Sequence, residues 1–207
     1  MALPALPPNY ITALELIDAA HAQDPTLTDG PSPVPYELHY AQKMTRLLAK
    51  HSPGASPALQ LACRAQHFQR WLTPRSTHPA TRPGYLLWRA KLKSLAATQV
   101  SDLLTSPSID PPLPPSEIER IAALIRKEGL SSSEPEVQTL EDVACLVFLE
   151  DQFDAFEKRE GMDEDKVITI LQKTWGKMGE RGRAMVLGGE VQVSERAKGL
   201  VARALGG

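Results

Sequence analysis

The chain has 207 residues, of which 42% are hydrophobic and 23% charged, and 23 Lys and Arg against 25 Asp and Glu leave a formal net charge of −2. This composition is typical of one globular domain. The net charge argues against a protein that binds nucleic acid by overall charge, although it does not exclude a local basic patch. No apolar run approaches the roughly 20 residues that span a bilayer, and residues 1–8 lack the basic start and apolar core of a signal peptide. The sequence therefore predicts a cytoplasmic protein without a membrane segment.

Proline and apolar spacing together predict the fold class. All 18 prolines lie at or before Pro135, and between them the apolar residues recur at helical intervals, as in Tyr36, Tyr40, Met44 and Leu47. We therefore expect an all-α fold, a compact bundle of six to eight helices that forms a single domain over 1–207. The expected helices cover about 9–22, 35–51, 57–72, 83–105, 115–129, 136–160, 163–180 and 190–205.

Local signals mark the ends of these elements. Ser56-Pro57, Pro115 and Ser133-Glu134-Pro135 are typical helix starts, because an oxygen can cap free amides and proline fits the first turn. The stretch 105–115 holds five prolines and is expected to be a stiff, exposed connection. A short tail at about 1–8 precedes the first helix, and Gly188-Gly189 sets off the last one.

Cys63 and Cys145 both lie in apolar helical patterns and form no CxxC or Cys/His cluster. They are interpreted as small core residues in a reducing compartment, rather than as a disulfide or zinc ligands.

Two acidic residues lie in an otherwise apolar segment. The segment 140–149 is apolar around nearly its whole circumference, which predicts a central, buried helix, and it contains Glu141 and Asp142. A buried carboxylate requires a cation, a metal or several hydrogen bonds. Two interpretations stay open: a functional site, or a salt bridge from one of the pair to an arginine.

His67 is expected on a helix with Arg64 and Arg70 one turn to either side. These cations disfavour imidazolium, and neutral imidazole is the form that binds a metal. The remaining histidines His21, His51 and His78 are interpreted as solvated residues near helix ends or in a loop.

The segment 70–89 concentrates arginines and aromatic residues. Arginine binds phosphate or carboxylate through two parallel hydrogen bonds, and aromatic faces stack on bases or on arginines. One interpretation is a clamp for an anion or a nucleotide beside His67. The other is structural, with Trp71, Tyr85 and Trp88 in the core and the arginines paired with Glu141, Asp142 or Glu150.

The chain order of three residues resembles that of the HD phosphohydrolase superfamily: a helical histidine, His39, a second histidine, His67, and an aspartate on a later apolar helix, Asp142. The resemblance implies an all-α, HD-like fold that binds one or two divalent metals (Mn, Fe, Mg or Zn) through these residues. It also implies hydrolysis of phosphate esters or, in a diiron branch, oxidation of a small substrate.

The sequence departs from the HD pattern at one position. Phe68 stands where an aspartate should follow the second histidine, so Glu141 or Glu150 would have to supply the missing carboxylate.

Three longer blocks resemble a narrower family. RAQHFQRWLTPRSTHPATRPGYLLWR, VQTLEDVACLVFLE and ILQKTWGKMGERG are similar to the signature blocks of an uncharacterised fungal and bacterial family often labelled glutamyl-tRNA synthetase. The chain contains no ATP-binding motif of a synthetase and has no room for a nucleotide-binding catalytic domain.

The leading functional hypothesis is a metal-dependent hydrolase of a small phosphorylated or nucleotide substrate, with His67 and Glu141 in catalytic roles. The residues expected to bind the substrate are Arg70, Arg75, Arg82, Tyr85 and Arg89. The alternatives are an HD-type diiron oxygenase and a non-catalytic module with a decayed metal site that binds an anion, an RNA end or a partner protein. Nucleic acid is the less favoured ligand, and the sequence does not specify the oligomeric state.

Overall fold

A computed structural model describes residues 2–29, 31–130, 134–158 and 162–206. Within these ranges the chain forms ten α-helices and no β-strand, which confirms the all-α class but exceeds the six to eight helices expected. In chain order they are α1 (Pro8–His21), α2 (Tyr36–His51), α3 (Pro57–Arg64), α4 (Arg82–Leu104), α5 (Pro115–Arg126), α6 (Pro135–Val147), α7 (Phe153–Glu157), α8 (Glu164–Lys177), α9 (Glu180–Leu187) and α10 (Glu195–Ala204).

The expected helix starts are confirmed where they can be described. The Ser56 hydroxyl accepts the amide of Leu59, and the Glu134 carboxylate accepts that of Val137, while Ser133 lies outside the described residues. Each cap is followed by a proline in the first turn, whose missing N–H would have no helical partner there.

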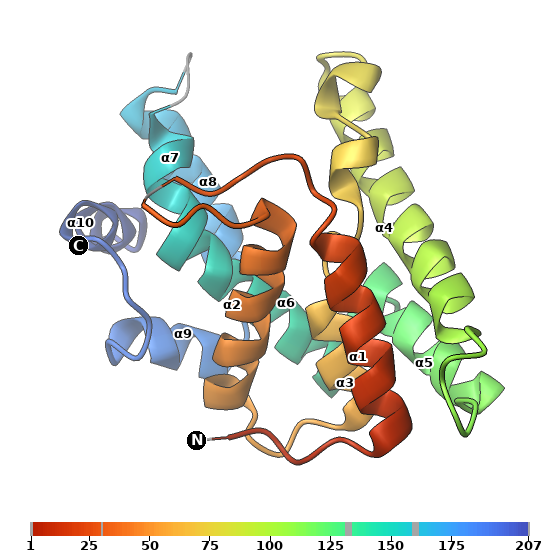
Figure 1. Ribbon diagram of the computed structural model, residues 1–207. Helices are drawn as coiled ribbons and strands as arrows, with labels where there is room; N and C mark the ends of the chain where they lie inside the picture. Colours follow the sequence, from red (N-terminus) through yellow and green to blue (C-terminus); the bar gives the residue numbers. More distant parts are fainter. Residues whose placement is uncertain (1, 30, 131–133, 159–161, 207) are drawn as a thin grey trace.

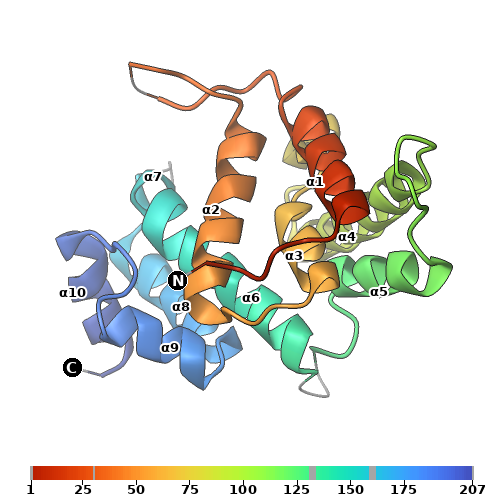
Figure 2. The ribbon, with the colours of Figure 1, turned by 60° about the horizontal axis from the view of Figure 1, so that its bottom comes forward.

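Helix α6 lies in the middle of the molecule, as its apolar sequence predicts. Figures 1 and 2 both place α8, α9 and α10 on one side of it and α3, α4 and α5 on the other, with α2 alongside. Leu140, Val143, Leu146 and Val147 are each fully enclosed in one core that also receives side chains from α1, α2, α3, α5 and α8. Glu141 and Asp142, which lie on the same helix, are therefore buried as well.

Several of the expected helices are shorter or interrupted. The helix expected over 57–72 ends at Arg64 and gives way to a turn and two 3₁₀ segments, η1 (Arg70–Leu72) and η2 (Arg75–Thr77). The long helix expected over 136–160 passes through a π-helical stretch, η4 (Phe148–Gln152). Helix α9, which the apolar pattern did not predict, begins after Gly179.

The connection at 105–114 is not simply exposed. Ile109 is 1% exposed and Leu113 is 3% exposed, because both side chains pack into the core.

Cys63 and Cys145 are buried free thiols, and burial raises the pKa of each to about 12, as expected of core cysteines. In the described part of the chain, no helix is both long and apolar enough to cross a membrane.

Candidate functional site

The turn that follows α3 places His67 and Arg70, and its backbone is unusual. His67 has φ 64° and Gln69 has φ 49°, so two non-glycine residues within three positions adopt the left-handed conformation. This conformation is costly for residues with a Cβ and persists where surrounding contacts impose it. The helix predicted through His67 is therefore wrong.

The buried carboxylate of Glu37 on α2 holds this turn. It accepts the amide of Gln69 at 2.9 Å and the amide of Arg70, so two backbone donors are satisfied by one side chain. It also pairs with Nδ1 of His21 at 2.9 Å, while Nε2 of His21 lies 3.0 Å from the carbonyl oxygen of Arg64. A carbonyl only accepts, so Nε2 donates, and one proton lies between His21 and Glu37. Burial raises the pKa of Glu37 despite the opposing hydrogen bonds.

The His67 ring is enclosed between an aromatic ring and a guanidinium group. It stacks on Tyr40 with ring centroids 4.5 Å apart, and an Arg70 N–H points to its Nε2 at 3.4 Å. Burial, with Arg70 and Lys127 nearby, lowers the pKa of His67 well below its ordinary value, so the ring is neutral. Arg64, by contrast, forms a bidentate pair with Asp18.

Arg70 is a half-buried cation whose guanidinium group has no carboxylate partner within the residues described. Its guanidinium lies over the Trp88 ring, 4.9 Å from the centroid, and the Trp88 indole donates to the carbonyl oxygen of Thr73 at 2.9 Å. Burial and the nearby Arg89 lower the pKa of Arg70. The cation is thus held in place by aromatic and neutral groups, while its charge is left uncompensated.

Further cations lie near the His67 ring and near Arg89. Burial, Lys127 and Arg89 lower the pKa of Lys93. Lys127 forms an ion pair with Glu141, whose pKa is lowered by Lys127, Lys177 and Arg89 despite burial. One carboxylate therefore faces several positive groups. We call His67, Arg70, Arg89, Lys93 and Lys127 the Arg70 site.

The other side chains predicted to bind substrate have different surroundings. Arg75 donates to the carbonyl oxygens of His78 at 2.8 Å and Pro79 at 2.6 Å, so it stabilises its own loop. Arg89 approaches the Tyr85 hydroxyl at 3.4 Å, and Tyr85 is 41% exposed. Arg82 is exposed at the start of α4. The structural interpretation of segment 70–89 is not fully met either. In the described residues, none of Arg75, Arg82 and Arg89 pairs with Glu141, Asp142 or Glu150.

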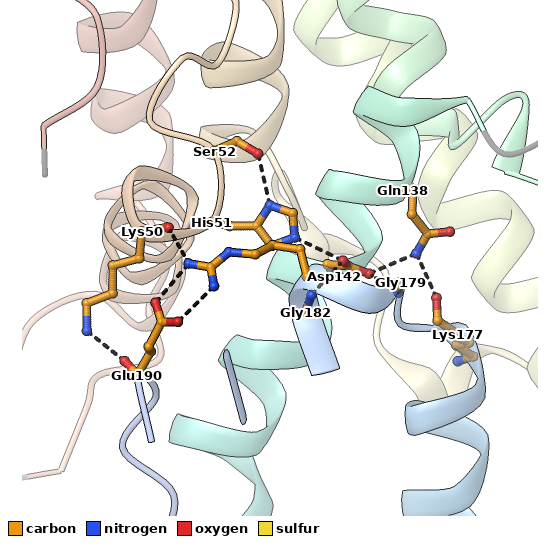
Figure 3. A network of polar contacts seen from close by, with 10 residues as sticks. Lys50, His51, Ser52, Gln138, Asp142, Lys177, Gly179, Gly182 and Glu190 are labelled. Carbon is orange, nitrogen blue, oxygen red and sulfur yellow. Dashed lines mark hydrogen bonds and ion pairs between the residues drawn. The ribbon is translucent and has the colours of Figure 1, made fainter. Parts of the chain in front are cut away.

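Asp142 lies in a separate polar network, shown in Figure 3. Its Oδ1 accepts the Gln138 amide group at 2.8 Å and the backbone N–H of Gly179 at 2.7 Å. Its Oδ2 pairs with Nε2 of His51 at 2.9 Å and accepts the backbone N–H of Gly182 at 3.2 Å. Burial tends to raise the pKa of Asp142, but these bonds outweigh it and hold the pKa below its ordinary value. The carboxylate anchors the start of α9 to α6 and to the end of α2.

Neighbouring contacts reinforce this anchor. Arg181 on α9 forms a bidentate pair with Glu190 at 2.8 Å and donates to the carbonyl oxygen of Lys50 at 3.1 Å (Figure 3). Ser52 lies 2.9 Å from Nδ1 of His51, so both ring nitrogens of that histidine are occupied.

The predicted metal ligands do not fit a metal. Asp142 uses about four acceptor positions on four protein donors, which leaves none for an ion. His39 pairs with Asp151 at 3.2 Å, and the His67 ring contacts Tyr40 and Arg70. Within the described ranges, no group of three or more His, Cys, Asp or Glu side chains is arranged to hold a metal.

Two histidines that the sequence assigned to solvent are instead buried. His21 is fully enclosed, and the His51 side chain is 7% exposed. His21 falls on the same helical stripe as Ile17, which is the signal that identifies it as an inward residue. No comparable local signal marks His51, because its partner Asp142 is 91 residues away. His78 is half-buried and contacts the neighbouring Thr77 hydroxyl.

Comparison with known proteins identifies the chain at the level of its family. No curated protein and no solved structure matches it, so the resemblance to HD phosphohydrolases gains no support. One family model, described as Domain of unknown function (DUF4202), matches residues 11–201. Because the match covers almost the whole chain, the protein belongs to this family.

Proposed function

We propose that the protein binds a small phosphorylated ligand at the Arg70 site. The observation that carries the proposal is the Arg70 guanidinium, which is half-buried against Trp88 and His67 yet has no carboxylate partner among the described residues. A buried cation without a counter-ion is unfavourable, and an incoming anion removes this penalty.

The charges around Arg70 favour a dianion over a monoanion. Arg89, Lys93 and Lys127 add three positive groups, and Glu141 offsets only one. A phosphate group carries close to two negative charges and accepts paired hydrogen bonds from a guanidinium group. The neutral His67 ring adds no further charge.

The local backbone supports binding rather than packing alone. Two left-handed residues store strain beside Arg70, and the Glu37 carboxylate holds them. Such strain is concentrated at functional sites because it fixes side chains before a ligand arrives.

The proposal covers binding and includes no reaction. The metal-dependent hydrolase and the diiron oxygenase both require a ligand set that these residues do not form, so neither is carried further. The structure gives little support for binding of RNA. Arg75 already donates to backbone carbonyls, and Trp88 is only 6% exposed, so few groups remain to contact phosphates or to stack on bases.

Calorimetric titration with inorganic phosphate, AMP and ADP tests the proposal. Arg70→Gln should weaken binding by about tenfold or more, because a charge-assisted hydrogen bond contributes about 1.5–3 kcal/mol. The matched control is Arg183→Gln, since Arg183 lies over Trp175 at 5.9 Å in another part of the molecule. Equal affinity in both variants, or no heat with any of the three compounds at millimolar concentration, would refute the proposal.

A further inference from the structure

Helix α4 is longer than the helix that covers it. It has 23 residues and α5 has 12, so α4 is about 35 Å long and α5 about 18 Å. The buried residues Ala96, Ala97 and Val100 lie in its C-terminal half, where α5 packs. Figure 1 shows the N-terminal half of α4 extending past α5 at the edge of the molecule.

The face that α5 covers continues without a cover. Ala90 lies seven residues before Ala97, and Leu86 lies fourteen before Val100, so each pair is on the same helix face. Leu86 is 55% exposed and its neighbour Leu87 is 62% exposed. Helical spacing joins them to Arg82 and Lys91, and all five side chains are exposed. We call Arg82, Leu86, Leu87, Ala90 and Lys91 the α4 patch.

The charge around the α4 patch has one sign along the chain. Between Glu37 and Asp102 the sequence contains ten Lys and Arg and no acidic residue. Two adjacent exposed leucines with Arg82 and Lys91 one helical turn away combine an apolar surface with positive charge, a pattern typical of an interaction site.

We propose that the α4 patch docks an acidic, leucine-bearing helical segment of a partner protein. The leucines would enter between apolar side chains of that helix, and its carboxylates would pair with Arg82 and Lys91. RNA fits less well, because leucine neither stacks on bases nor donates a hydrogen bond. This proposal does not rest on the binding proposed for the Arg70 site.

The experiment uses the full chain as bait for a displayed library of random helical peptides. Enriched peptides should carry both leucine and Asp or Glu, and their affinity is then measured by fluorescence anisotropy. The double variant Leu86→Ser with Leu87→Ser should weaken binding at least tenfold, and Lys91→Glu should weaken it severalfold. Leu187→Ser is the matched control, because Leu187 is 70% exposed at the end of α9.

Circular dichroism confirms that each variant keeps its helical content, which is expected since the substituted side chains are exposed. Four outcomes would overturn the proposal: no enriched peptide, enriched peptides without acidic residues, unchanged affinity in the double variant, or tighter binding to phosphatidylserine vesicles than to the peptides. Self-association that the double variant abolishes, measured by light scattering, would assign the patch to a second copy instead.

Discussion

The backbone N–H of Gly182 donates to Oδ2 of Asp142 at 3.2 Å, and the approach is so close that a Cβ on residue 182 would lie 2.8 Å from this carboxylate. The start of α9 can therefore rest on α6 only through glycine. We expect Gly182→Ala to lower the free energy of unfolding by about 1–3 kcal/mol, because the buried carboxylate has no room to move. Urea denaturation measures the change.

The control for this substitution is another helical glycine. Gly199 lies in α10, and a Cβ there meets nothing within 4 Å. Gly199→Ala should raise the stability by up to about 1 kcal/mol, because alanine favours helix. Equal effects of the two substitutions would contradict the contact with Asp142.

Asp142 should make the stability of the folded protein depend on pH in the acidic range. Its pKa is lowered in the folded protein, so its stabilisation is complete above the unfolded value of about 3.9 and is lost as pH falls through the lower folded value. At neutral pH, Asp142→Asn should cost about 3 kcal/mol, because one acceptor group is replaced by a donor that faces other donors. The stability gap between the wild type and this variant should narrow only below about pH 4. A gap of constant size from pH 7 to pH 2 would show that the carboxylate is not the stabilising form.

Glu37 should be required for the turn that carries His67 and Arg70. Glu37→Ala leaves the amides of Gln69 and Arg70 and the ring of His21 without their acceptor, and should lower stability by about 3 kcal/mol or more. Glu15→Ala on the exposed face of α1 should change it by less than about 0.5 kcal/mol. Thermal unfolding of both variants decides whether Glu37 is special.

The His67 ring should stay neutral at pH values at which an exposed histidine becomes protonated. Because burial and two nearby cations lower its pKa, the unfolded chain binds a proton below about pH 6.5 that the folded protein does not. Stability should therefore fall as pH decreases below 6.5, by at most about 1.4 kcal/mol per pH unit from this residue. His67→Gln should remove that part of the pH dependence.

The ring itself can be observed directly. Nitrogen chemical shifts of His67 should keep the neutral pattern from pH 8 to pH 5.5, with the proton on Nδ1, since Arg70 donates to Nε2. A titration of the His67 ring near pH 6.5 would contradict its enclosure by Tyr40 and Arg70.

Features that depend on neighbouring residues could be predicted from the sequence. Ser56-Pro57 and Glu134-Pro135 mark helix starts because a cap acts within one turn, and the apolar residues of α6 indicate burial because they repeat with the period of the helix. The same reasoning predicted that Glu141 and Asp142 are buried acids that need partners.

The limits of such reasoning show at the turn after α3. The apolar spacing continues a helix through His67, and the turn contains no glycine or proline to interrupt it. The turn is instead held by Glu37, a residue 32 positions before Gln69 whose carboxylate accepts the amide of Gln69. A contact across that separation leaves no mark on local spacing.

The sequence by itself determined the helical class and the buried central helix, because caps and the apolar period act over a few residues. Only the tertiary structure decided that Asp142 meets His51 rather than His67, that Glu141 meets Lys127, and that the guanidinium group of Arg70 has no carboxylate partner in the described part of the chain. Packing of the helices sets these pairs, and a partner 91 residues away is chosen by which faces come together rather than by any neighbour in sequence.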